Sequence, residues 1–310
     1  MPNRTQDNQF LSTTMEEDFL DNFHLVYEND NDTKKLKFFC PLIDANSLNY
    51  DGLIVALRDA AGHYCLSRRT WNEYVNKPMQ LSHLVREKFR LTETNKGELG
   101  ELLLFSFLES DLKAPKLLTK MELKTNPNMY FNGADGVHYL KLANGDFQLI
   151  FGESKAYEDL DDGISAAIGS IFKFKNDAIK DDESGQVRGI TFEKGLLNAH
   201  LTAETFSEQE CAFLKSLIYP KSTQGFCVDT AFAVFVLYNI QIPDEQKSKS
   251  NIEFRSWLFD GLKKSITELL PSILKEISDK QLSGHSFYFY IVPFENMEEN
   301  RDIVLRGTIE

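Results

Sequence analysis

Hydrophobic and polar residues follow two different periods along this chain, and these periods predict helices in some segments and strands in others. Apolar residues that recur every three to four positions predict a helix over 51–61, with Asp51 as its N-cap. The same spacing predicts further helices over 80–90, 94–109, 162–178 and 253–280, the last of them interrupted at Pro271.

Runs of β-branched and aromatic residues predict the strands. Residues 230–241 (TAFAVFVLYNIQ) are the most β-like run and predict a central strand, and residues 287–293 predict a last strand. Residues 36–43 predict an edge strand, because Pro41 has no amide hydrogen to donate to a neighbour. Residues 1–35 are polar and acidic, which is typical of a loosely ordered lead-in.

These elements predict a mixed α/β fold, in which helices flank a mixed sheet and the two ends of the chain add elaborations to the core. We expect residues 1–90 to be an N-terminal extension that packs on the core and offers a candidate partner interface. We expect residues 91–310 to form the core domain. Its order of helix, extended segment, hairpin and helix surrounds the residues with the most unusual chemistry.

One face of a predicted strand over 149–157 (LIFGESKAY) changes abruptly from apolar to charged. At a period of two residues, Phe151, Glu153 and Lys155 share this face. Burying a Glu beside a Lys is costly unless the two are paired or hold a cation. Glu153 and Lys155 are therefore candidate site residues.

The length of the preceding hairpin loop decides which residue faces Glu153. A two-residue turn would place Asp135 opposite Ser154. A three-residue loop over 143–145, with Gly145 in the left-handed region, places Asp135 opposite Glu153 instead. This second register also pairs apolar residues with apolar residues, so it is the one we expect.

Asp135, Glu153 and Lys155 match the D…E-x-K pattern of restriction-endonuclease-like nucleases, the PD-(D/E)xK class. The two acids, together with the backbone carbonyl of Ser154, supply the hard oxygen ligands that Mg²⁺ or Mn²⁺ prefers. Such a metal polarises a phosphate, while Lys155 orients or activates the attacking water and offsets developing charge. The pattern thus predicts metal-dependent phosphodiester hydrolysis.

An acid on the preceding helix often completes a site of this kind, and Glu98 and Glu101 are both available. We favour Glu101 as the catalytic residue, because its spacing after Gly97 resembles a G-x-x-x-E pattern. Each signal alone has a simpler interpretation: Asp135 as a turn residue, E-x-K as a chance match, and the helix acids as solvated positions. Their occurrence together, in the required order, favours the nuclease interpretation.

His138 is a weaker candidate, because it would face away from Asp135 on the predicted strand. A packed histidine is the simpler interpretation. A basic segment before the hairpin contains Lys113, Lys116, Lys120 and Lys124.

The net charge of −13 is unusual for a protein that meets DNA. Affinity for a polyanion rests on Lys and Arg residues that neutralise phosphates. A local basic groove can coexist with an acidic shell, but the isolated chain is expected to bind DNA weakly. The charge therefore points to a partner or an activation step.

Composition predicts a cytoplasmic protein that does not enter membranes. The sequence has no run of about 18 apolar residues, the length that a membrane span requires. The N-terminus (MPNRTQDNQF) has no apolar signal region, and the four cysteines lack the C-x-x-C spacing of a zinc site. Reduced thiols in the core are the expected state.

At these residues the chain resembles the HamA family, the nuclease subunits of bacterial Hachiman antiphage systems. The similar segments are KGELGELLLFSFLES (96–110), APKLLTKMELKTNPNMYFNGADGVHYL (114–140) and FGESKAYEDL (151–160). The resemblance is good over about residues 80–180 and loose in the flanks. It implies a HamB-like helicase partner that holds the nuclease inactive until DNA is engaged, and it implies catalytic roles for Asp135, Glu153 and Lys155, with Glu101 less firmly supported.

Two other functions stay open from the residues alone. The chain could be a regulatory subunit with a nuclease fold and no chemistry, which predicts no Mg²⁺ affinity and no DNA degradation. It could instead be a stand-alone restriction or repair endonuclease, which predicts DNA cleavage without any partner. The complete acid–acid–lysine set argues against the regulatory subunit, because a degenerate site usually loses one member.

Overall fold

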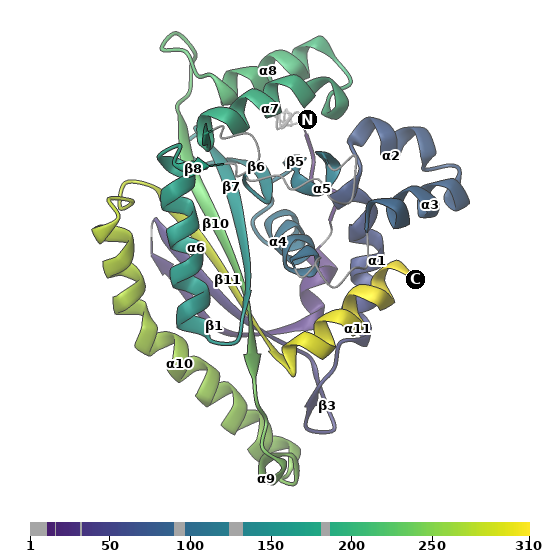
Figure 1. Ribbon diagram of the computed structural model, residues 1–310, viewed down its shortest axis with the longest axis vertical. Coiled ribbons are helices and arrows are strands. Elements are labelled where there is room, and N and C mark those ends of the chain that lie inside the picture. Colours follow the sequence, from purple (N-terminus) through teal and green to yellow (C-terminus); the bar gives the residue numbers. More distant parts are fainter. Residues whose placement is uncertain (1–10, 16, 32, 90–96, 124–132, 181–186) are drawn as a thin grey trace, which may run out of the picture.

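A mixed sheet lies at the centre of the protein and helices cover both of its faces (Figure 1). The computed structural model describes residues 11–15, 17–31, 33–89, 97–123, 133–180 and 187–310. In this part of the chain, the sheet has seven strands in the order β1-β2-β11-β10-β7-β6-β5. These strands are β1 (Phe23–Asn31), β2 (Lys34–Pro41), β5 (Lys116–Thr119), β6 (Gly136–Lys141), β7 (Phe147–Tyr157), β10 (Val228–Ile240) and β11 (Ser286–Glu295).

The middle of the sheet is parallel and its two ends are antiparallel. Strands β2, β11, β10 and β7 run in the same direction, whereas β1, β6 and β5 pair antiparallel with their neighbours. Residues 231–237 of β10 are completely buried, as expected for a parallel strand with helices on both faces. Two small sheets lie outside the central one: β3 (Ile43–Asp44) with β4 (Ser47–Leu48), and β8 (Ile179–Lys180) with β9 (Val187–Arg188).

The helices form a layer on each face of the sheet. Helices α6 and α10 pack on one face, and α4 packs on the other, where α1 and α11 cover it. Helices α7 and α8 lie at the end of the sheet near β5 and β7 (Figure 1). The helices are α1 (Asp51–Cys65), α2 (Arg68–Tyr74), α3 (Pro78–Lys88), α4 (Glu98–Ser110), α5 (Lys120–Leu123), α6 (Leu160–Lys175), α7 (Ile190–Glu204), α8 (Glu208–Ile218), α9 (Asp244–Lys247), α10 (Asn251–Asp279) and α11 (Met297–Ile309), with a 3₁₀ helix at Glu17–Asn22.

Helix α4 is buried along its whole length, because it is apolar around its full circumference and is enclosed by the sheet, α1 and α11. Its polar side chains therefore bond internally. Ser106 and Ser110 donate to the carbonyls one turn earlier, at 2.9 and 2.6 Å. Glu109 accepts hydrogen bonds from the backbone of Thr14, Met15 and Lys116, which fixes the N-terminal segment across the helix.

Two predictions for the N-terminal part are wrong. Residues 23–31 are not a loose lead-in but strand β1, and β1 rather than β2 is the edge of the sheet. Pro41 is tolerated inside the sheet because it is the last residue of β2, where a missing amide hydrogen ends the ladder without interrupting it. Strand β2 lies beside β11, so the segment expected to be an extension contributes to the central sheet. The expected boundary at residue 90 lies outside the described residues.

The predicted break at Pro271 is also wrong, because α10 continues through this residue as one helix. Leu262, Ile266, Ile273 and Ile277 are buried on both sides of Pro271, and this packing holds the two halves in line against the cost of the proline. Other helices are correctly placed with small shifts, although the N-cap of α1 is Tyr50 and not Asp51. The sequence pattern predicts none of helices α2, α5, α7, α8, α9 and α11.

The predicted hairpin register is confirmed. Val137 pairs with Phe151 and Tyr139 with Leu149, and the last pair of the hairpin is Gly136 opposite Gly152, which Asp135 and Glu153 adjoin. The loop over 143–145 is closed by a hydrogen bond from the Leu142 amide to the Asp146 carbonyl, at 2.8 Å. Gly145 has a φ of 91°, which is the left-handed conformation that the three-residue loop requires.

None of the helices in the described part of the chain combines the length and the apolar character that a bilayer span needs.

A Gly145→Ala substitution should lower the free energy of unfolding by about 1 kcal/mol or more, because a side chain disfavours this positive φ. The matched control is Gly169→Ala in α6, where an added Cβ meets nothing within 4 Å. There the better helix propensity of alanine should stabilise the protein by up to about 1 kcal/mol. Denaturant unfolding measures both changes, and equal effects of the two substitutions would contradict the loop geometry.

Candidate active site

The hairpin of β6 and β7 brings Asp135 and Glu153 together at the start of β6. The Asp135 amide donates at 2.9 Å to the carbonyl of Gly152, the residue that Gly136 pairs with, so Asp135 is held against the end of the hairpin ladder. One carboxylate oxygen of Asp135, Oδ2, accepts the Ser154 amide at 2.8 Å. Asp135 is only 7% exposed. The side chain is therefore fixed by the strand that carries the E-x-K residues.

Alternate residues of β7 point to opposite faces of the sheet. Phe151 packs on Phe174 of α6, and Glu153 and Lys155 lie on that same side by the two-residue period. Ser154 points the other way, because a Cβ on Gly100 of α4 would lie 2.4 Å from its hydroxyl. A glycine at position 100 thus allows the first turn of α4 to approach β7 closely.

Glu153 and Lys155 form an ion pair along β7, with 2.5 Å between Oε1 and Nζ. Burial raises the pKa of Glu153, the charge of Asp135 raises it further, and Lys155 opposes both effects. Burial disfavours the charge on Lys155, but the Glu153 carboxylate outweighs burial and raises the pKa of Lys155. Lys155 is therefore held as a cation at neutral pH.

Glu101 reaches this group from the α4 side. Its carboxylate is nearly buried, and its Oε2 accepts the hydroxyl of Tyr64 at 2.8 Å. Its Oε1 lies 4.0 Å from the ammonium of Lys120, which also contacts Asp135. Glu98 is buried in the same turn. Of the two acids, Glu101 is the one whose ion pair with Lys120 connects it to Asp135.

Lys120 belongs to the site, although the sequence marked it only as one member of a basic segment. Its ammonium lies 3.1 Å from Oδ1 of Asp135, and its amide donates to the Asp135 carbonyl at 3.1 Å. Burial disfavours its charge, but Asp135, Glu101 and Glu153 together raise the pKa of Lys120 well above its ordinary value. No spacing rule could identify Lys120, because the pairing of β5 with β6 brings it to Asp135.

Glu193 is a second residue that the sequence did not indicate. It lies in the first turn of α7, is 4% exposed and accepts the backbone amide hydrogen of Ala134. A Cβ on Gly133 would lie 2.4 Å from its carboxylate, so the chain passes directly over it. Burial raises the pKa of Glu193 to about 7, whereas Lys120 and the Ala134 amide lower it. Glu193 supports the turn that presents Asp135.

His138 is packed, as predicted, and does not face the carboxylates. The ring nitrogen Nδ1 lies 2.8 Å from the Ala114 carbonyl, and the side chain is 1% exposed. Burial lowers the pKa of His138 to about 4, so the imidazole is neutral at pH 7.

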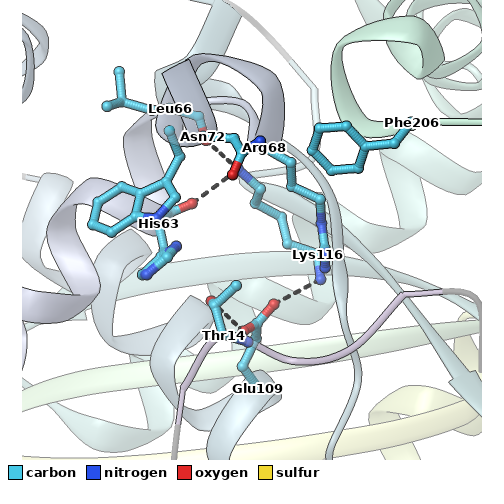
Figure 2. A pocket seen from close by; sticks show the side chains of 9 residues that line it. Thr14, His63, Leu66, Arg68, Asn72, Glu109, Lys116 and Phe206 are labelled. Carbon is cyan, nitrogen blue, oxygen red and sulfur yellow. Dashed lines mark hydrogen bonds between the residues drawn. The ribbon is translucent and has the colours of Figure 1, made fainter. Parts of the chain in front are cut away.

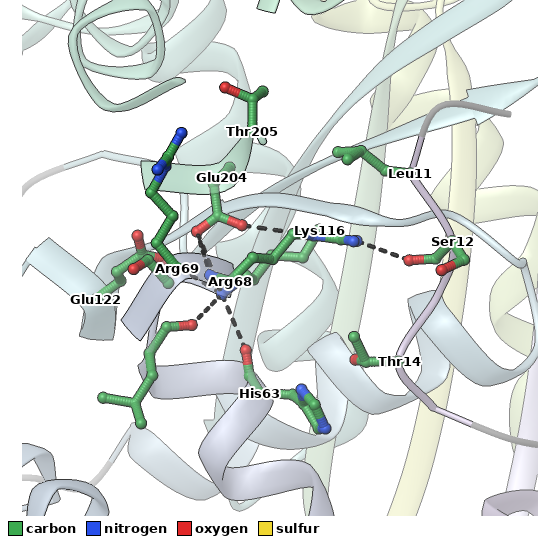
Figure 3. Close-up of polar contacts among 12 residues, drawn as sticks. Leu11, Ser12, Thr14, His63, Arg68, Arg69, Lys116, Glu122, Glu204 and Thr205 are labelled. Atoms are coloured by element: carbon green, nitrogen blue, oxygen red, sulfur yellow. Dashed lines mark hydrogen bonds and ion pairs between the residues drawn. The ribbon is translucent and has the colours of Figure 1, made fainter. Parts of the chain in front are cut away.

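A second buried charge cluster lies behind the site and holds α1, β5 and α5 together (Figure 3). The ammonium of Lys116 donates to the carbonyls of His63 and Leu66, at 2.9 and 2.7 Å, and to Glu122 at 3.1 Å. Glu204 lies 4.0 Å from the same ammonium. Lys116 is therefore a structural cation of the interior and not part of a basic surface for DNA.

A cavity of about 150 Å³ opens beside this cluster, between His63, Trp71 and Phe206 (Figure 2). Asp135, Glu153 and Lys155 do not line it. The cavity is thus separate from the candidate active site.

The carboxylates do not converge on one point in this arrangement. Within the described residues, no group of three or more His, Cys, Asp or Glu side chains is arranged as metal ligands are. Asp135 and Glu101 face Lys120, and Glu153 faces Lys155. The donor set nevertheless suits Mg²⁺ or Mn²⁺, because hard carboxylate oxygens are the ligands these ions prefer and because these like charges need a cation nearby.

The mixed sheet, with acidic residues and an E-x-K strand on its hairpin, defines an α/β protein of the nuclease-like class. Comparison with protein families then gives the particular family. The model of the HamA family matches residues 15–305, and the chain belongs to that family. The protein is accordingly a component of the Hachiman antiphage defence system, which has several components. No curated protein matches the chain.

A Glu193→Ala substitution should lower the free energy of unfolding by about 1–3 kcal/mol, because it leaves the buried Ala134 amide without its acceptor. Glu193→Gln should cost much less, since the amide oxygen of glutamine can accept the same hydrogen bond. Thermal and denaturant unfolding of the two variants measure the difference. Equal losses would show that Glu193 does not act by holding the Ala134 amide.

Proposed function

We propose that this HamA-family chain is a metal-dependent deoxyribonuclease of the PD-(D/E)xK type. The observation that carries the proposal is the hairpin register, whose last pair is Gly136 opposite Gly152, so that Asp135 and Glu153 adjoin the same pair and Lys155 follows two residues further along the strand. Burial and the charge of Asp135 raise the pKa of Glu153, so the two carboxylates repel each other unless a cation lies near them. A phosphodiesterase site needs such an arrangement.

Asp135 and Glu153, with the carbonyl of Ser154, would hold Mg²⁺ or Mn²⁺. When bound, the ion would supply Lewis-acid polarisation of the scissile phosphate. The protein contributes the fixed positions of its own oxygens. The Ser154 amide holds Asp135 through Oδ2, and the hairpin ladder sets its distance from Glu153.

Lys155 acts as a fixed positive charge in this proposal. Its raised pKa keeps the ammonium protonated at neutral pH, so it stabilises negative charge and does not accept a proton from water. Glu153 holds the ammonium in place through their ion pair. Lys155 can therefore orient the attacking water and offset the charge that develops on the phosphoryl oxygens.

Glu101 contributes a further carboxylate from α4. The hydroxyl of Tyr64 in α1 donates a hydrogen bond to Oε2 of Glu101 in α4. Two helices therefore fix the position of the Glu101 carboxylate. We place Glu101 in the catalytic set as the acid that the preceding helix supplies.

In this proposal, a partner protein supplies most of the binding affinity for DNA. The chain has a net charge of −13, and the two best-placed cations of its basic segment, Lys116 and Lys120, are engaged with internal carboxylates. Affinity for a polyanion rests on cations that neutralise phosphates, and these lysines are not available for that. By its resemblance to the family, the partner is a HamB-like helicase that keeps the nuclease inactive until it is triggered.

Glu153→Gln or Lys155→Met should each reduce DNA degradation by the activated complex by about 100-fold or more, because each removes a charge that acts on the reacting phosphate. Degradation of labelled DNA by the purified complex measures this. The control is Glu268→Gln on the exposed face of α10, where the side chain is 66% exposed. Full cleavage by both site variants would leave the regulatory-subunit interpretation as the better one.

The isolated chain should degrade DNA slowly or not at all in Mg²⁺, and the addition of the helicase and its DNA trigger should restore degradation. The acidic surface is the physical reason, because it repels the substrate. The measurement is a time course of cleavage with and without the partner. Rapid cleavage by the chain alone would instead identify a stand-alone nuclease.

A further inference from the structure

The ammonium of Lys120 lies between acids that come from two different elements. It is 3.1 Å from Oδ1 of Asp135 and 4.0 Å from Oε1 of Glu101, and the charge of Glu153 also acts on it. Only 18% of the side chain is exposed. A protein cation thus already lies among the carboxylates that we assign to a metal.

In each of the two acids, one carboxylate oxygen accepts a hydrogen bond from a neighbouring group of the fold, and the other oxygen faces Lys120. Asp135 uses Oδ2 for the Ser154 amide and directs Oδ1 at the ammonium. Glu101 uses Oε2 for the Tyr64 hydroxyl and has Oε1 on the side of the ammonium. Oδ1 of Asp135 and Oε1 of Glu101 are therefore the carboxylate oxygens that Lys120 faces.

The backbone of Lys120 is held firmly, so this contact follows from the fold. Its amide donates to the Asp135 carbonyl, and Lys116 binds Glu122, two residues after Lys120 (Figure 3). The Thr119 hydroxyl donates to the Tyr64 carbonyl at 2.6 Å, which connects the start of α5 to the residue that anchors Glu101. Only the flexible four-carbon stem of Lys120 can change its position.

We propose that Lys120 is a built-in counter-ion of Asp135 and Glu101 that must be displaced when a divalent metal binds to these acids. This inference rests on the proposed function, because it assumes that a divalent metal acts at this site. Mg²⁺ binds oxygen at about 2.0–2.1 Å, so an ion on Oδ1 of Asp135 cannot share that side of the oxygen with an ammonium. Lys120 also explains why the carboxylates do not converge: each is held toward a lysine.

Lys120 competes with the metal ion for the same carboxylate oxygens. Its removal should therefore raise the affinity for metal, whereas removal of a metal ligand would lower it. While the ammonium is in place, it offsets the repulsion among the acids and so stabilises the metal-free protein. A metal ion must break the ion pairs between Lys120 and the acids before it can bind the same carboxylate oxygens. Removing the ammonium should therefore tighten metal binding and destabilise the metal-free protein.

The test is the binding of Mn²⁺ to the full chain, measured by isothermal titration calorimetry, with thermal unfolding as a second readout. Lys120→Met should bind Mn²⁺ at least about tenfold more tightly than the wild-type chain. Its metal-free Tm should be lower than that of the wild type, and Mn²⁺ should raise its Tm by more. Lys120→Gln is the second variant, and it keeps the length and a hydrogen-bond donor if the methionine variant does not fold.

The matched control is Lys155→Met, which removes the cation that pairs with Glu153 and leaves the one between Asp135 and Glu101 in place. It should tighten Mn²⁺ binding clearly less than Lys120→Met. An equal gain in both variants would overturn the proposal, since the effect would then be one of total charge. Unchanged or weaker binding by the Lys120 variants, with normal binding by the wild type, would also overturn it and leave the proposed function intact. No Mn²⁺ binding by any of the proteins would overturn both.

Discussion

Repulsion between Asp135 and Glu153 across a buried hairpin is the constraint on which the rest of the site depends. Burial and mutual repulsion both disfavour two charged carboxylates at this position, as the raised pKa of Glu153 shows. Lys155 offsets the charge of Glu153, and Lys120 offsets the charge of Asp135 and Glu101. Each lysine is placed by a different element. The two lysines therefore allow these acids to be kept close together.

The surrounding fold fixes these side chains with interactions that are themselves buried. Glu193 holds the turn before Asp135, Tyr64 holds Glu101, and Gly100 lets α4 approach Ser154. Behind them, Lys116 joins the end of α1 to α5, and Glu109 of α4 joins the N-terminal segment to β5 (Figures 2 and 3). Loss of one partner from such a network costs more than loss of an exposed ion pair, because the remaining group stays buried. The network explains how a site rich in like charges keeps one geometry.

Membership of the HamA family and the acidic composition are consistent with each other in physical terms. A net charge of −13 disfavours contact with free DNA, and under our proposal this would limit degradation of the host's own DNA. Lys116 and Lys120 of the basic segment form ion pairs with buried carboxylates and are therefore not available to bind phosphates. The low affinity for DNA that this charge predicts is consistent with our proposal that another component of the system engages the DNA.

The sequence by itself determined the periodic elements and the hairpin. Apolar residues of β6 and β7 match best in one of the two possible registers, and Gly145 supplies the backbone conformation that this register needs, so the approach of Asp135 to Glu153 was predictable. Only the tertiary structure decided the rest. Lys120 and Glu193 reach the site through contacts between segments far apart in the chain, and no local spacing encodes such contacts. Likewise, β1 became the edge strand and α10 stayed continuous through Pro271 because packing against neighbouring elements outweighed local preference.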